Sequence, residues 1–282
     1  MGSPHLSWHK LRVQGRRAEV GLGGDGPIVV LLHGWAVSGR TYRKAHHRLL
    51  EQGYRVVAPS LPGFGSTTAL PRHDLDLAGY AEWVAALLDE LGVDEPAAVL
   101  GHSFGGGVAV QLATEHPGRV RALVLVNSVG GSVWRPEDDD DATQHLADRP
   151  IWDWGLHFTR EARNVLPVVA RDILRNVVIN PRSFVRVAGL ARRADLRAQL
   201  EALRDRDLPI VVLWGDEDRI LPRSSLVALA AAGGADTRVI SGRHSWLITH
   251  PETFAEAMTN VAGMLGPTDE PNQGETSTGS TT

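Results

Sequence analysis

One short stretch, "GHSFGG" at residues 101–106, places a serine between two glycines in the pattern G-x-S-x-G. A serine hydroxyl becomes an effective nucleophile when a base accepts its proton and a third group orients that base. Gly101 and Gly105 suit a sharp strand-to-helix turn, because a β-carbon at either position would collide with the crowded backbone. Ser103 is therefore the candidate nucleophile. The alternative is a helix N-cap in a glycine-rich turn.

A base and an acid are expected further along the chain, in the order serine, acid, histidine. The segments "LWGDEDRILP" (213–222) and "ISGRHSWLITHPETF" (240–254) offer Asp218 and His244 as the candidates. Asp216 could also reach the site, but it lies next to a strand end and is expected to bond backbone amides. His250 is a rival base, although its place before a helix-starting proline favours a capping role.

Short apolar runs recur along the chain and predict the elements that must position these side chains. Continuous hydrophobicity is typical of parallel strands that are buried on both faces. Between the runs, apolar residues recur at helical spacing, which predicts helices there. Alternating strands and helices predict an α/β fold with a doubly wound, mostly parallel sheet. The predicted strands are "PIVVLLH" (27–33), "YRVVAP" (54–59), "PAAVLGH" (96–102), "RALVLVN" (121–127), "PIVVLWG" (209–215) and "TRVIS" (237–241).

One interval is too long for a simple strand-helix-strand unit. Residues 129–207 are therefore expected to form an inserted helical cap, and residues 1–128 and 208–265 to form the core. Residues 266–282 have almost nothing to bury and are expected to be disordered.

Composition limits the classes of function. The net charge of −4 comes from 29 basic and 33 acidic residues spread along the chain, so no nucleic-acid partner is expected. The chain has no cysteine and no apolar stretch of membrane-spanning length, so a soluble, cytoplasmic protein is expected. The adjacent His46 and His47 lack metal-ligand spacing and are expected at the surface. Neither a metal nor another cofactor is expected.

Five motifs in order resemble those of the α/β-hydrolase fold family, in its cap-bearing, lipase- and esterase-like branch. They are "HGW" (33–35), "LPGFGS" (61–66), "GHSFGG", the acid turn "GDEDRILP" and the histidine turn, and the resemblance spans about residues 11–265. It implies a triad of Ser103, Asp218 and His244 and a cap at the insertion.

The resemblance also implies an oxyanion hole formed by the backbone N–H groups of Trp35 and Phe104. The position of Phe104 is physically suitable, because the N-terminus of a helix favours developing negative charge. Two departures from relatives are visible. Ser60 stands where many relatives have an acidic residue, and Asn127 stands where some relatives keep the triad acid, which favours the later turn.

The substrate is expected to be small and apolar, because aromatic residues fall near the catalytic positions and in the insertion. Trp152, Trp154, Phe158 and Trp246 are the candidate substrate-binding residues, although each could instead pack the cap onto the core. The predicted function is hydrolysis of a small or medium apolar carboxylic ester through an acyl-enzyme. The same triad could cleave carbon–carbon bonds, lactones or amides or form peracids. A ligand-binding, receptor-like protein with negligible turnover is an alternative of another class.

Overall fold

The structure is a computed structural model of the chain, and it describes residues 5–134, 144–150, 157, 170 and 172–266. The predicted tail therefore lies outside the described residues, apart from Gly266. So do Trp152, Trp154 and Phe158.

An eight-stranded sheet with the order β1-β2-β4-β3-β5-β6-β9-β10 forms the centre of the molecule. The first two strands form an antiparallel hairpin, β2 pairs antiparallel with β4, and the other neighbours are parallel. The strands are β1 (Ser7–Val13), β2 (Arg16–Gly23), β3 (Ile28–Leu32), β4 (Arg55–Pro59), β5 (Ala97–His102), β6 (Val120–Val126), β9 (Ile210–Gly215) and β10 (Asp236–Ile240). The predicted fold class is confirmed.

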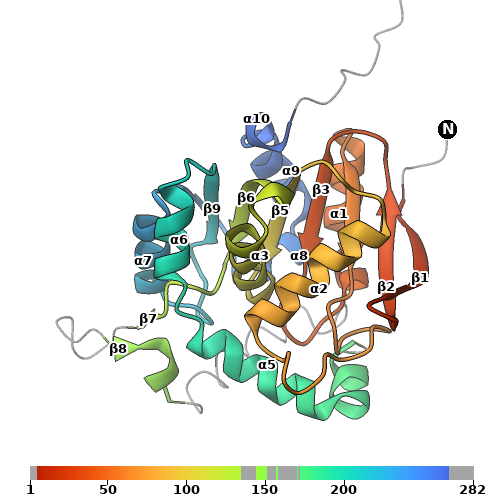
Figure 1. Cartoon of the computed structure of the whole chain (residues 1–282). Helices are drawn as coiled ribbons and strands as arrows, with labels where there is room; N and C mark the ends of the chain where they lie inside the picture. Colours follow the sequence, from red (N-terminus) through yellow and green to blue (C-terminus); the bar gives the residue numbers. More distant parts are fainter. Residues whose placement is uncertain (1–4, 135–143, 151–156, 158–169, 171, 267–282) are drawn as a thin grey trace, which may run out of the picture.

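Helices cover both faces of this sheet (Figure 1). One face is covered by α2 (Leu77–Glu90), α3 (Phe104–Glu115), α6 (Arg197–Arg204) and α7 (Arg223–Gly233). The other is covered by α1 (Arg43–Glu51), α8 (Trp246–Thr249), α9 (Pro251–Thr259) and α10 (Ala262–Leu265). The short 3-10 helices η1 (Gly39–Tyr42) and η2 (Pro117–Arg119) precede α1 and β6.

The central strands are apolar throughout because both of their faces are covered. Every residue of β3, β5 and β9 is buried, and their side chains divide between two hydrophobic clusters on opposite sides of the sheet. Such strands need no polar face, which explains why the sequence shows apolar runs instead of alternation.

Part of the insertion lies across one end of the sheet. It contains β7 (Val133–Trp134), β8 (Gln144–His145), η3 (Leu146–Asp148) and α5 (Pro181–Arg193). In Figure 1, α5 runs below the end of the sheet at which α3 begins. In contrast, α6 packs beside α3 and α7, as a helix of the core layer would. Of the helices that the structure describes, none has the length and apolar character needed to cross a membrane.

Candidate active site

The carboxyl ends of four adjacent parallel strands meet at one edge of the sheet. Register pairs Leu32 with Gly101, His102 with Val126, and Val126 with Leu213. The segments that follow these strands therefore emerge side by side, although they are far apart in the sequence. Ligand sites of open α/β sheets form at this edge.

Ser103 occupies a strained backbone conformation between β5 and α3. Its φ is 53° and its ψ is −118°, which is unusual for a residue with a side chain. A β-carbon at Gly101 would lie 2.5 Å from the carbonyl oxygen of Gly105, and one at Gly105 would lie 2.3 Å from that of Leu32. The prediction that both glycines are sterically required is confirmed.

The structure brings the three predicted side chains into one hydrogen-bonded line. Nε2 of His244 lies 3.0 Å from Oγ of Ser103, and its Nδ1 lies 2.8 Å from Oδ2 of Asp218. All three residues are at least nine-tenths buried. In this arrangement Nδ1–H donates to the carboxylate, so that Nε2 faces Oγ as the acceptor of the serine proton.

Asp218 is held by four hydrogen bonds. Its Oδ1 accepts from the backbone N–H groups of Ile220 and Leu221 at 2.8 and 3.0 Å, and its Oδ2 accepts from His244 and from Nδ2 of Asn127 at 2.6 Å. Burial alone would raise the pKa of this carboxyl, but the positive field of His244 and these hydrogen bonds hold the pKa below its usual value. The group is therefore a buried carboxylate that orients an imidazole.

Asn127 is a functional neighbour that sequence reasoning did not assign. Its Oδ1 accepts from Nε1 of Trp246 at 2.8 Å and from the N–H of Gly215 at 3.3 Å, while its Nδ2 donates to Asp218. A φ of 41° at Asn127 is one that asparagine tolerates better than most residues. The position is the strand end at which some relatives keep the acid, and that was the only signal in the sequence.

The prediction that Trp246 binds substrate needs correction. Its side chain is completely buried in the hydrophobic cluster beneath the sheet, next to the ring of Phe254. The indole N–H of Trp246 donates to Oδ1 of Asn127, whose Nδ2 donates to Asp218. Trp246 therefore helps to position the Asp218 carboxylate through Asn127.

The two rival residues play other roles. Oδ1 of Asp216 accepts from the backbone N–H of Gly242 at 2.9 Å, which ties the acid turn to the histidine turn as expected of a residue that shapes the backbone. His250 is exposed at the start of α9, and its Nδ1 lies 2.8 Å from the hydroxyl of Thr249. Neither side chain has a hydrogen bond with Ser103, Asp218 or His244.

The candidate oxyanion donors belong to segments that follow two adjacent strands, β3 and β5. Phe104 is the first residue of α3, and its buried ring packs edge-on against Tyr80 at 5.1 Å. Trp35 follows β3, and its indole N–H donates to the carbonyl of Phe184 in α5 at 2.7 Å. Trp35 thus joins the loop after β3 to the insertion.

Three polar residues of the insertion, each four positions after the last, form further hydrogen bonds to the loops of the core. They are Asp172, Asn176 and Asn180. Residues 172–179 are helical and precede α5. Oδ2 of Asp172 accepts from the hydroxyls of Ser38 and Thr41 at 2.5 and 2.6 Å. Asn176, which is 1% exposed, donates to the carbonyl of Ala36 at 3.0 Å.

The same residue, Asn176, also accepts from the N–H of Gly65 at 3.1 Å, and Asn180 donates to the carbonyl of Gly63 at 3.1 Å. Asp172, Asn176 and Asn180 are called the seam below. They fasten the insertion to the loops that follow β3 and β4.

A second chain of hydrogen bonds links the candidate oxyanion loop to the histidine turn. The N–H of Gly34 donates to Oη of Tyr42 at 3.0 Å, and Oη lies 2.6 Å from Nδ1 of His102. Nε2 of His102 in turn donates to the carbonyl of His244 at 2.9 Å. Burial lowers the pKa of His102 to about 3, so this imidazole is neutral and can accept at one nitrogen while it donates at the other.

In the described part of the chain, no group of three or more acidic or histidine side chains is placed to hold a metal ion. The geometry resembles a serine nucleophile with its base and acid, and the comparison with known proteins agrees with it. A family model described as the alpha/beta hydrolase fold matches residues 27–251. The chain belongs to the α/β-hydrolase fold family.

Similar proteins bear the names of different enzymes. A pimeloyl-[acyl-carrier protein] methyl ester esterase of Aeromonas hydrophila is 31% identical over 254 residues, which are 85% of this chain and 97% of the relative. A Mycobacterium phage D29 protein that bears the name of a non-heme haloperoxidase is 32% identical over 256 residues, or 86% of this chain and 90% of the relative.

Among solved structures, an esterase from Exiguobacterium antarcticum matches with a TM-score of 0.73 and 22% identity. The match covers 93% of this hydrolase and all of the esterase. This likeness concerns the fold.

Proposed function

We propose that this hydrolase cleaves a small or medium apolar carboxylic ester through an acyl-enzyme on Ser103. The observation that carries the proposal is the position of the His244 ring, which lies within hydrogen-bond distance of both Ser103 and Asp218. The buried Asp218 carboxylate fixes the imidazole in the tautomer that accepts a proton at Nε2.

In the first half of the reaction, Oγ of Ser103 attacks the ester carbonyl carbon while Nε2 of His244 takes the hydroxyl proton. The resulting oxyanion would be bound by the N–H groups of Trp35 and Phe104. As the tetrahedral intermediate collapses, the carbon–oxygen bond breaks and the imidazolium returns its proton to the leaving alcohol. Asp218 stabilises the imidazolium throughout these steps.

In the second half, His244 takes a proton from water, whose oxygen attacks the acyl carbon. As the second intermediate collapses, the bond between the acyl carbon and Oγ of Ser103 breaks, the imidazolium returns its proton to Oγ, and the carboxylic acid is released. None of these steps uses a cofactor.

We also propose that residues 129–207, apart from α6, which packs in the core layer, supply a cap over this edge of the sheet. The seam and the bond from Trp35 to Phe184 support this role. Trp152, Trp154 and Phe158 remain the proposed acyl-binding residues from the sequence, and alanine at each should shift the preferred acyl length.

A turnover screen tests the proposal. The wild type and Ser103→Ala are assayed on p-nitrophenyl esters of graded acyl length, with lactones, amides and dienoic carbon–carbon substrates alongside. We expect hydrolysis of the shorter esters and a loss on the order of 10⁴ to 10⁶ in the alanine variant. Saturable binding of small apolar ligands with no turnover of any substrate would instead indicate a receptor-like protein.

The relative named as a haloperoxidase favours one second candidate, perhydrolysis. Hydrogen peroxide would replace water in the second half-reaction, so that the acyl-enzyme is released as a peracid. Peracid formation from acetate and hydrogen peroxide, abolished in Ser103→Ala, would support this candidate.

A further inference from the structure

His46 departs from the expectation that it is exposed. Its side chain projects from α1 and is 2% exposed, and its buried Nε2 has no hydrogen-bond partner among the described residues. Burial lowers its pKa to about 3, so the ring is neutral. A buried polar atom without a partner is costly in a native protein and calls for an explanation, such as a bound ligand.

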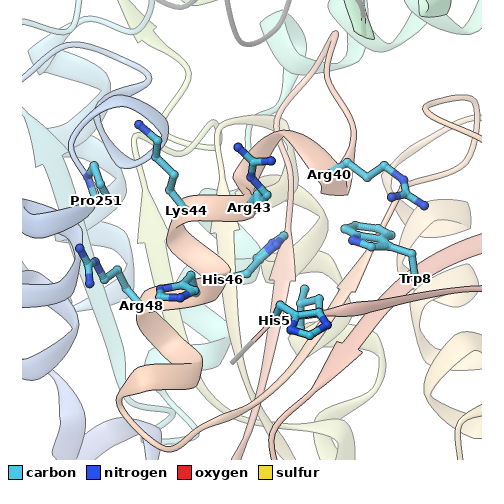
Figure 2. A pocket seen from close by; sticks show the side chains of 10 residues that line it. His5, Trp8, Arg40, Arg43, Lys44, His46, Arg48 and Pro251 are labelled. Atoms are coloured by element: carbon cyan, nitrogen blue, oxygen red, sulfur yellow. The ribbon is translucent and has the colours of Figure 1, made fainter. Parts of the chain in front are cut away.

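A cavity of about 600 Å³ lies beside this ring, between α1 and the segment that leads into β1. Figure 2 shows His46 projecting between Arg43 and Trp8 toward this space. The lining combines apolar surface from Leu6, Trp8 and Pro251 with a set of basic groups. The other lining residues are His5, Arg40, Arg43, Lys44, His46, His47 and Arg48, and none of the ten is acidic.

Two of the four lysine and arginine residues in this lining are already neutralised. Arg40 pairs with Glu19 at 3.1 Å and lies over the ring of Trp8, 4.3 Å from its centroid. Arg48 pairs with Glu51 and Glu252. The acidic partners in these ion pairs, Glu19, Glu51 and Glu252, are not among the residues that line the cavity.

Arg43 and Lys44 differ, because neither forms an ion pair with any residue that the structure describes. They are the first two residues of α1, and the first turn of this helix contains no acidic residue. The helix dipole disfavours cations at this end. Their placement does not stabilise the helix, and both side chains are exposed, so they are available to an anionic ligand at this rim of the cavity.

A second hollow of about 700 Å³ shares Trp8, Arg40, Arg43 and Lys44 with the cavity, and it continues to Ser66 and Arg175. Of the acidic residues in this second hollow, Glu19 forms an ion pair with Arg40, and the Asp172 carboxylate accepts hydrogen bonds from the neutral hydroxyls of Ser38 and Thr41. Arg43 and Lys44 thus stand between two hollows. A ligand longer than a bare ion can be accommodated.

We propose that the cavity between α1 and β1 binds an organic phosphate monoester, whose phosphate lies against Arg43 and Lys44 and whose apolar group lies on Leu6, Trp8 and Pro251. The imidazole of His46 provides one further hydrogen bond to the ligand or to a water that it holds. Phosphate oxygens accept strong charge-assisted hydrogen bonds from such cations. This binding site is distinct from Ser103 and does not depend on the proposed reaction.

Titration calorimetry with phenyl phosphate as the probe tests this proposal at low, constant ionic strength. Inorganic phosphate tests the anion alone, and benzyl alcohol tests the ring alone. We expect one saturable site for phenyl phosphate, weaker binding of inorganic phosphate and none of benzyl alcohol. The double variant Arg43→Gln/Lys44→Gln should weaken phenyl phosphate binding by at least about tenfold.

Arg223→Gln is the matched control, because Arg223 is also the first residue of a helix, α7, but does not line the cavity. It should bind phenyl phosphate as the wild type does. The double variant should keep the wild-type melting temperature and ester hydrolysis, since both side chains are exposed at an unfavourable helix end and neither takes part in the hydrogen bonds around Ser103. Equal binding by the double variant, or no binding by the wild type, would overturn the proposal.

Discussion

Two aspartates of one turn differ in what they contact. Asp218 accepts from His244, Asn127 and two backbone amides, whereas Asp216 bonds the amide of Gly242. The sequence could place both at the right edge of the sheet. The sequence favoured Asp218 as the acid and Asp216 as a partner of backbone amides, and the hydrogen bonds of both carboxylates agree with that choice.

Asp218→Asn should therefore lower kcat by about 10⁴, because an amide favours the wrong imidazole tautomer and cannot stabilise the imidazolium. Asp216→Asn is the matched control and should cost far less in kcat, with its main effect on stability. Steady-state kinetics on both folded variants decide between them. A severe loss confined to Asp216→Asn would mean that the acid is misassigned.

The candidate nucleophile and base could be proposed from local sequence, because a serine between required glycines and a histidine after a late strand are short-range patterns. Asn127 and the bond between Tyr42 and His102 were not, since they depend on contacts across 91 and 60 positions of the chain. Trp246 was misjudged for a related reason. Nearness in sequence to His244 says nothing about which side of the turn the indole occupies.

At the scale of elements, the seam ties the insertion to the loop that carries Trp35. Asn176 holds the carbonyl of Ala36, whose φ of 71° is strained for alanine. The Asn176 side-chain amide donates to the carbonyl of Ala36, and this bond can fix the orientation of the neighbouring Trp35 N–H. We therefore expect Asn176 to be a positioning residue for the proposed oxyanion hole.

We expect Asn176→Ala to lower kcat by about tenfold or more with little change in KM, because oxyanion stabilisation acts in the transition state. Asn180→Ala removes a seam bond to Gly63 and leaves Ala36 untouched, so it serves as the control. Both are compared at equal folded fraction by circular dichroism. Equal losses of kcat in the two variants would show that the seam acts only through stability.

The buried parallel strands were predictable because short, continuous apolar runs are typical of strands that are covered on both faces. The hairpin of β1 and β2 was not among the predicted strands. Most of β1 is exposed, and its residues "SWHKLRV" include no continuous apolar run. Edge strands of this kind are specified mainly by pairing with a neighbour, as β2 pairs with β4.

At the scale of the whole molecule, three of the four buried histidines in the described part of the chain make stability depend on pH. Burial lowers the pKa of His33 to about 4 and those of His46 and His102 to about 3, from 6.5. Below pH 6.5 these histidines are protonated in the unfolded chain but remain neutral in the native protein, so the free energy of unfolding falls as the pH falls. Asp218, whose pKa is also lowered, adds a further loss once its unfolded carboxyl is protonated at still lower pH.

Each such histidine contributes about 1.4 kcal/mol per pH unit within this window, so the three together contribute at most about 4 kcal/mol per pH unit. Urea unfolding at a series of pH values between 6.5 and 4.5 measures the slope. His46→Gln should remove about a third of it, whereas His73→Gln, at a side chain that is 80% exposed, should leave it unchanged. A flat profile over this range would contradict the neutral state of the buried rings.

The account depends above all on covalent chemistry at Ser103, and peptide mapping by mass spectrometry after treatment with a fluorophosphonate probe tests it most directly. We predict one adduct per chain, located on Ser103, and no adduct in Ser103→Ala. An adduct on a different residue, or labelling that persists in the alanine variant, would contradict the assignment of Ser103 as the nucleophile.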